Sequence, residues 1–192
     1  RTATLKLEVG PDPLWIAGQE MMTSSFFQAW TDSLAAESYI TKSIAGTSGR
    51  GRPMPMLEFG DPGASRHVMV IGRQHPPEAT GTMALLAFVE ELAGNSPLAQ
   101  EFRESFRVHV IPMVNPDGNH KVWNASSMWR KNTRGGYGVD INRNYSHDWG
   151  ACYGSSGSKW SDIFRGSSAA SEPETQALMK LAERIKPVFN VS

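Results

Sequence analysis

The most constraining feature of this sequence is a run of four consecutive apolar residues, Val-Met-Val-Ile at positions 68–71. A strand with one face in water alternates apolar and polar residues, whereas a continuous apolar run is typical of a strand buried on both faces. A helical apolar pattern follows over 79–93 and ends at Gly94, and another strand is predicted over 106–114. Because strands alternate with helices, we predict an α/β fold with helices packed on a central sheet.

The rest of the chain extends this pattern. The other predicted elements are a strand over 3–9, a helix over about 24–34 capped by Thr23 or Ser24, strands over about 38–45 and 53–60, a helix over about 171–185 and a strand from Pro187. Asn-Pro-Asp-Gly at 115–118 predicts a turn. Residues 118–170 are rich in Gly, Ser and Asn and predict long loops, which usually carry a site when they lie inside a compact domain.

Composition narrows the classes of partner. The 192 residues suffice for one domain with a sizeable core, and 19 Lys and Arg balance 19 Asp and Glu. No net field therefore draws the chain to nucleic acid or to an anionic membrane. Its longest apolar runs fall far short of the roughly 20 residues that span a bilayer. We therefore expect neither a nucleic-acid partner nor a membrane partner.

The start of the chain suggests a piece of a longer protein, because it begins at Arg1 without a methionine. Residues 1–20 are interpreted as a strand and a linker that could end an upstream β domain, since Pro-Asp-Pro at 11–13 breaks the strand. The single cysteine, Cys152, excludes an internal disulfide and fits both cytoplasmic and exported bacterial proteins. No base lies beside it in the sequence, so we do not expect it to act as a nucleophile.

His75 and Glu78 are the first candidates for chemistry, because His-Pro-Pro-Glu falls where the buried strand gives way to a helix. Ligands of α/β sheets bind at the carboxyl ends of strands. An imidazole and a carboxylate three residues apart can point at one metal ion when the turn between them is tight, and two prolines stiffen that turn. The pair equally suits a helix start, with Glu78 near the helix dipole and His75 simply hydrogen-bonded. By themselves the two residues leave both interpretations open.

Arg130, Asn142 and Arg143 are candidates within the predicted loops. Arg130 lies in Trp-Arg-Lys-Asn, and the other two lie in Val-Asp-Ile-Asn-Arg-Asn-Tyr at 139–145. A guanidinium beside an amide is well suited to hold a carboxylate by bidentate hydrogen bonds. A loop arginine is usually a solvated surface charge, so each fragment alone could be structural.

Taken in order, these motifs resemble the zinc carboxypeptidases of the carboxypeptidase A type. The order is His-x-x-Glu, Asn-Pro-Asp-Gly, Trp-Arg-Lys and Gly-Val-Asp-x-Asn-Arg-Asn, and the similarity continues through 149–157, 164–168 and 171–175. It covers about residues 22–192 and looks most like the bacterial secreted members. The resemblance implies a mixed central sheet with helices on both faces, a catalytic domain over 21–192, and a secreted or periplasmic location with the cytoplasm as the alternative.

The resemblance also gives each candidate residue a role. His75 and Glu78 match two of the three zinc ligands, and Arg130 matches the arginine that stabilises the oxyanion. Asn142 and Arg143 match the pair that grips the free C-terminal carboxylate of the substrate. The implied function is hydrolysis of the last peptide bond of peptides or proteins, with one zinc ion as cofactor.

By the same resemblance the site is not complete within these residues. A catalytic zinc site takes three protein ligands, and the family's remaining histidine and general-base glutamate would follow Ser192. His109, His120 and His147 do not fall in matching places and are expected to be structural. We therefore expect the 192 residues alone to bind zinc weakly and to have little activity.

Two other functions stay open. The chain could belong to a noncatalytic peptide- or zinc-binding relative, which the downstream glutamate would decide. It could also belong to an amidase of the same fold that acts on acylated amino acids or cell-wall peptides. The Asn-Arg pair for a terminal carboxylate favours a peptidase over an amidase.

Overall fold

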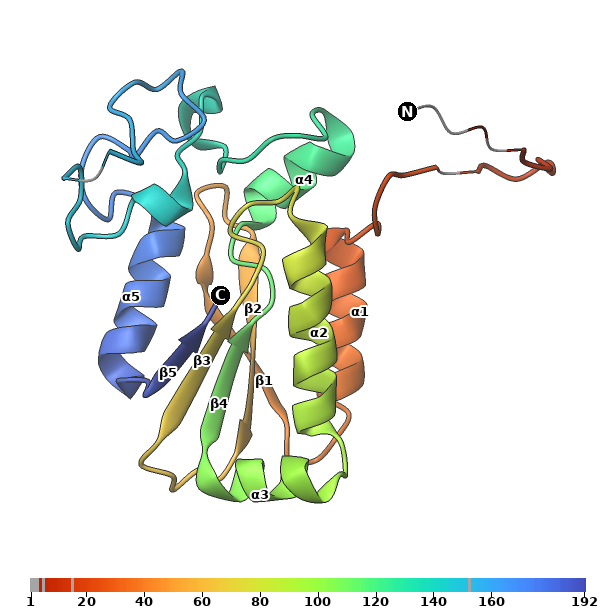
Figure 1. Cartoon of the computed structure of the whole chain (residues 1–192), viewed down its shortest axis with the longest axis vertical. Helices are drawn as coiled ribbons and strands as arrows, with labels where there is room; N and C mark the ends of the chain where they lie inside the picture. Colours follow the sequence, from red (N-terminus) through yellow and green to blue (C-terminus); the bar gives the residue numbers. More distant parts are fainter. Residues whose placement is uncertain (1–3, 5, 15, 152) are drawn as a thin grey trace.

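The computed structural model of the chain describes residues 4, 6–14, 16–151 and 153–192. Within this part, a single five-stranded sheet forms the centre of the molecule, in the order β1-β2-β4-β3-β5 (Figure 1). β3 is parallel to β4 and to β5, whereas β2 is antiparallel to both of its neighbours, β1 and β4. The strands are β1 (Thr41–Thr47), β2 (Pro53–Gly60), β3 (His67–Ile71), β4 (Arg107–Ile111) and β5 (Phe189–Val191). The predicted mixed α/β sheet is confirmed.

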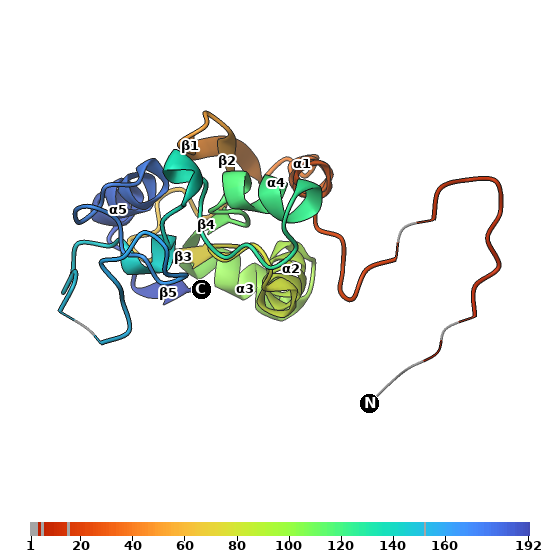
Figure 2. The ribbon, with the colours of Figure 1, turned by 90° about the horizontal axis from the view of Figure 1, so that it is seen from above.

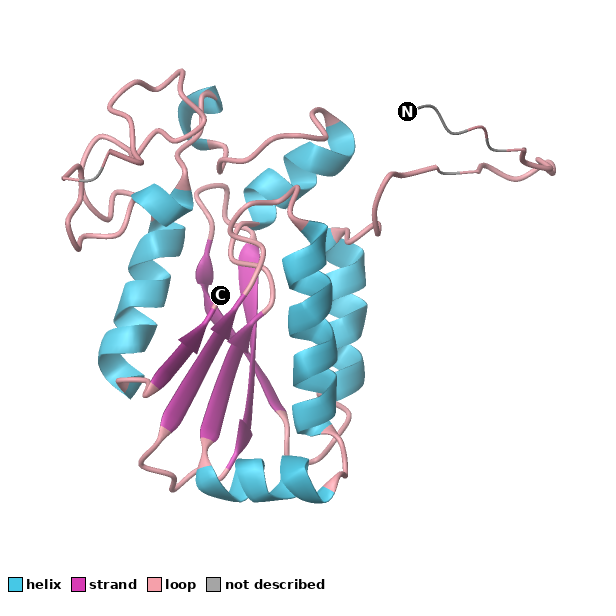
Figure 3. Cartoon of the chain, in the orientation of Figure 1, coloured by secondary structure: helices cyan, strands magenta, loops and turns pink. Residues whose placement is uncertain are grey.

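Helices cover both faces of the sheet. They are α1 (Ser24–Leu34), α2 (Ala79–Ala93), α3 (Pro97–Ser105), α4 (Pro116–Asn124) and α5 (Pro173–Ile185), with two short 3-10 turns, η1 (Arg134–Gly136) and η2 (Ile141–Arg143). Seen from above, α2 and α5 lie on opposite sides of the sheet (Figure 2). The long segments between α4 and α5 gather at one end of the sheet (Figure 3).

The continuous apolar run in β3 is explained by this layering. Val68 and Val70 belong to the core cluster that includes α1 and α2, whereas Met69 and Ile71 belong to the cluster that includes α5. Successive side chains of a strand point to opposite faces, so a strand covered on both sides needs apolar residues at every position. The predicted boundary of α2 is also confirmed, because the helix ends at Ala93 with Gly94 at its C-cap.

One local prediction at a helix start is wrong, and one helix was not predicted. Asn115-Pro-Asp-Gly begins α4 and is not a turn: the Asn115 side chain accepts a hydrogen bond from the Gly118 N–H at 2.8 Å, and Pro116 occupies the first helical turn. The same residue types favour turns and helix N-termini, so the local pattern does not separate the two. α3 was not predicted; Ser96 caps this helix by accepting a hydrogen bond from the Ala99 N–H.

The predicted strand over 3–9 is wrong for the residues that the structure describes, 4 and 6–9, which form no strand. Leu7 is 44% exposed and Val9 is 66% exposed. An alternating pattern becomes a strand only when a neighbouring strand satisfies its backbone groups, and this segment has none in the described part of the chain. Its remaining residues, 3 and 5, lie outside the described ranges.

In the described residues, every helix is too short or too polar to cross a lipid bilayer.

The two neighbouring phenylalanines of α1 test the core assignment. Phe27 is 0% exposed and Phe26 is 37% exposed. Because Phe27→Ala leaves a cavity, we expect it to lower the free energy of unfolding by about 3–5 kcal/mol, and Phe26→Ala by less than about 1 kcal/mol. Urea unfolding followed by tryptophan fluorescence measures both variants. Equal losses would contradict the placement of α1 on the sheet.

Candidate metal centre and substrate-binding loops

His75 and Glu78 lie in the loop that joins the carboxyl end of β3 to α2. At Gly72 the loop passes close to α2 and to the segment after β4, because an added Cβ would lie 2.8 Å from the Leu85 side chain and 3.2 Å from the Pro112 carbonyl oxygen. The Glu78 N–H then donates to the His75 carbonyl oxygen at 3.1 Å, which closes the tight turn around the two prolines. The turn therefore carries both side chains to the edge of the sheet where α/β proteins bind ligands.

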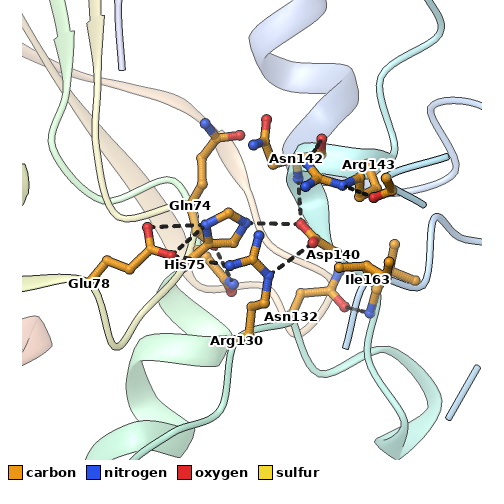
Figure 4. Close-up of polar contacts among 12 residues, drawn as sticks. Gln74, His75, Glu78, Arg130, Asn132, Asp140, Asn142, Arg143 and Ile163 are labelled. Atoms are coloured by element: carbon orange, nitrogen blue, oxygen red, sulfur yellow. Dashed lines mark hydrogen bonds and ion pairs between the residues drawn. The ribbon is translucent and has the colours of Figure 1, made fainter. Parts of the chain in front are cut away.

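The imidazole of His75 faces the Glu78 carboxylate directly. His75 Nδ1 lies 3.1 Å from Glu78 Oε1 and 3.2 Å from Oε2 (Figure 4). Two donor atoms that share one zinc ion at about 2.1 Å, at a tetrahedral angle, stand about 3.4 Å apart. The nitrogen-oxygen donor set suits a zinc ion, and the spacing between the donors, slightly shorter than this, is also that of the hydrogen bond between the two side chains.

A buried carboxylate, Asp140, contacts the opposite side of the His75 ring. Asp140 is 0% exposed; its Oδ1 lies 3.0 Å from His75 Nε2, and its Oδ2 accepts from Arg130 Nε at 3.0 Å. Arg130 Nη1 in turn donates to Glu78 Oε1 at 3.1 Å, so the four side chains form a closed ring (Figure 4). Burial alone would raise the pKa of the Asp140 carboxyl, but the hydrogen bonds and charges of His75 and Arg130 outweigh it and lower the pKa.

Asp140 also shapes the turn that follows it. Its Oδ1 accepts from the Asn142 N–H at 3.0 Å and so caps η2, as Asp commonly does at a helix start. Asn142 lines a cavity of about 660 Å³ together with His75 and Glu78. Arg143 lies next to it, and its guanidinium donates to the carbonyl oxygens of Gly154 at 2.6 Å and of Asn142 at 3.1 Å.

The five predicted site residues thus fall into two groups. Glu78 contacts both His75 and Arg130, and Asn142 borders the same cavity as His75 and Glu78. Arg143 adjoins Asn142 but is turned to a neighbouring loop in this conformation. No role was predicted for Asp140, although its position two residues before Asn142 is a signal for a side-chain cap.

Two buried asparagines fix the loops that carry these residues. Asn132 Oδ1 accepts from the backbone N–H groups of Arg134 at 3.1 Å and Val139 at 2.8 Å, and its Nδ2 donates to Glu172 at 2.7 Å. Asn144 Nδ2 donates to the Arg165 carbonyl at 2.8 Å, and its Oδ1 accepts from the Glu172 N–H at 3.0 Å. Both loops are thereby tied to the start of α5.

The other histidines lie elsewhere. His109 contacts Glu58 and His67, His120 contacts Asn124, and the His147 side chain is 94% exposed. Throughout the described part of the chain, no three His, Cys, Asp or Glu side chains are grouped to hold a metal ion. Cys152 lies outside the described residues.

Comparison with known proteins decides the family. The model of the zinc carboxypeptidase family matches residues 27–192. The chain belongs to this family. It is 32% identical over 162 residues to carboxypeptidase B of Bos taurus, and this match covers 79% of the chain and 39% of that protein. It is 33% identical over 155 residues to carboxypeptidase B of Astacus astacus, and this match covers 76% of the chain and 51% of that protein.

Solved structures agree with the fold. Carboxypeptidase A from Helicoverpa armigera superimposes with a TM-score of 0.78 at 27% identity, over 91% of the chain and 47% of that structure. One relative, from Talaromyces marneffei, is 28% identical over 161 residues and is named an inactive metallocarboxypeptidase; the match covers 76% of the chain and 27% of that protein. The chain spans about half, or less, of the length of the relatives it matches. The predicted family and its zinc carboxypeptidase fold are confirmed.

Substitution of Asn132 tests whether its hydrogen bonds hold the loops of the candidate site. Asn132→Ala leaves the Glu172 carboxylate and two backbone N–H groups without their buried partner, so we expect the free energy of unfolding to fall by about 2–3 kcal/mol. Asn95→Ala, at an exposed position, serves as the matched control and should change it by less than about 0.5 kcal/mol. Chemical unfolding measures both, and a neutral Asn132→Ala would show that the loops are fixed by other contacts.

Proposed function

We propose that this chain forms part of the catalytic domain of a zinc-dependent metallocarboxypeptidase, which hydrolyses the C-terminal peptide bond of peptides and proteins. The observation that carries the proposal is the ring of His75, Glu78, Arg130 and Asp140 at the carboxyl end of β3. Membership of the zinc carboxypeptidase family over residues 27–192 supports it.

In this proposal His75 Nδ1 and the Glu78 carboxylate hold the zinc ion. Asp140 fixes the orientation of the His75 ring through Nε2, which leaves Nδ1 free for the metal. A third ligand comes from outside the described residues, since a catalytic zinc site takes three protein ligands. The zinc ion, when bound, supplies a Lewis acid that polarises the scissile carbonyl and activates water.

Arg130 is proposed to stabilise the oxyanion that forms at the scissile carbonyl. Its Nε and Nη1 are fixed by Asp140 and Glu78, and its side chain is 27% exposed. A guanidinium carries five N–H donors, so donors beyond the two fixed ones remain for substrate. A cation that is already held in place costs no reorganisation as negative charge develops.

Asn142 and Arg143 are proposed to bind the free carboxylate of the substrate. The Asn142 backbone is fixed by Asp140, the same residue that orients His75, so the carboxylate site has a set distance from the metal site. Arg143 reaches the substrate by exchanging the Gly154 carbonyl for a carboxylate, with which it forms a stronger, bidentate contact. Holding the chain end in this way would place the last peptide bond at the zinc ion.

The domain limits and the location stay predictions from the resemblance. We propose that residues 21–192 lie in the catalytic domain and that the protein acts in a secreted or periplasmic setting.

The first test is mass spectrometry of a peptide mixture incubated with the protein from its native source, so that the natural length is assayed. We expect stepwise loss of C-terminal residues from free-acid peptides and none from peptides with amidated ends. A zinc chelator should abolish the loss and added zinc should restore it, because cleavage depends on the metal.

Other outcomes separate the alternatives. Intact peptides beside bound zinc would favour a noncatalytic relative, a possibility raised by the relative named inactive. Release of acylated amino acids with intact peptides would favour the amidase.

Arg143→Ala should raise the KM for free-acid peptides by about 100-fold while zinc binding is unchanged, which corresponds to a charge-assisted contact of about 3 kcal/mol. An unchanged KM would refute the role of Arg143.

A further inference from the structure

A second cavity of about 660 Å³ lies at the opposite end of β3 and β4 from the candidate metal centre. Its polar lining includes the first residues of these strands, His67 and Arg107, and residues of β2, β4 and α5; these further residues are Glu58, His109, Lys180 and Arg184. It shares no lining residue with the cavity at His75. The family resemblance assigns none of these residues a role.

A continuous line of polar side chains crosses four adjacent strands at this cavity. Ser43 Oγ on β1 donates to Glu58 Oε2 on β2 at 3.3 Å. Glu58 Oε1 lies 3.1 Å from His109 Nδ1 on β4, and His109 Nε2 lies 2.9 Å from His67 Nδ1 on β3. The sheet register sets this line, because Glu58 and His109 are directly opposed partners. The side chains are therefore held in fixed positions.

His109 is only partly satisfied in this line. It is 3% exposed, and its Nδ1 faces the Glu58 carboxylate at 3.1 Å without hydrogen-bond geometry, so this buried nitrogen has no hydrogen-bond partner. Burial lowers the pKa of the His109 imidazole to about 4; the charge of Glu58 opposes this shift, and His67, Arg107 and Arg184 add to it. A buried polar atom without a partner is costly, and it commonly marks a place where a water molecule or a ligand belongs.

The charges around the cavity favour an anion. Arg107, Lys180 and Arg184 supply three cations against the single carboxylate of Glu58. Lys180 and Arg184 are four residues apart on α5, so they lie on the same side of the helix, and both are exposed. The same positive field opposes a metal cation.

We propose that this cavity binds a small oxyanion of the phosphate or carboxylate class. Arg184 and Lys180 supply charged donors from the helix, and Arg107 supplies a charged donor from the sheet. The oxyanion offsets the excess positive charge. Glu58, as the one carboxylate of the lining, limits the affinity.

Calorimetric titration of the whole chain tests the proposal, with inorganic phosphate in one arm and acetate in the other, at low salt and with a chelator present. We expect saturable binding with one site. Lys180→Ala with Arg184→Ala should weaken it by about tenfold or more, and Glu58→Gln should tighten it. Lys6→Ala with Lys159→Ala is the matched control, because it removes the same charge from exposed positions outside the cavity and should leave the affinity unchanged.

The outcomes are decisive in either direction. Tighter binding of phosphate than of acetate assigns the phosphate class, and equal or tighter binding of acetate assigns the carboxylate class. Absence of saturable binding, equal losses in the two double variants, or no gain in Glu58→Gln would each overturn the proposal. Binding that survives loss of Lys180 and Arg184 but disappears in Arg143→Ala would place the anion at the candidate active site and overturn it as well.

Discussion

The buried carboxylate of Asp140 is the interaction on which the candidate site depends. One of its oxygens faces His75 and accepts from the Asn142 backbone, and the other accepts from Arg130. A charge with no exposed surface is tolerated only when it is paired and hydrogen-bonded, and here cationic and neutral donors meet that need. The same bonds therefore satisfy Asp140 and fix the two groups proposed to bind zinc and to stabilise the oxyanion.

The fold supplies the rigidity that this arrangement needs. β3 is packed on both faces and delivers His75 from its carboxyl end, while Asp140 and Arg130 come from loops with little regular structure. Those loops are held through the buried side chains of Asn132 and Asn144, which both bond to Glu172 at the start of α5. Since α5 packs on the same sheet, the loops that carry Arg130 and Asp140 are fixed relative to the strand that carries His75.

Sequence patterns predicted those features that are set by residues close together in the chain. The apolar run of β3 required cover on both faces, and Gly94 marked the end of α2. The strand prediction over 3–9 failed because a strand needs a partner strand. The turn prediction at 115–118 failed because an Asn side chain favours turns and helix caps alike, and here Asn115 caps α4. Asp140 was missed for a different reason: its contact with His75 spans 65 positions of sequence, and no spacing rule encodes such a contact.

The most direct test of this account is the zinc affinity of Asp140→Asn, measured by competition with a chromophoric chelator. We predict a loss of about 10–100-fold relative to the unchanged chain, because the amide holds the His75 ring less firmly and no longer balances Arg130. Asp148→Asn, at a side chain that is 66% exposed, is the control and should bind zinc normally. Unchanged affinity in a folded Asp140→Asn, verified by circular dichroism, would contradict the claim that Asp140 organises the metal centre.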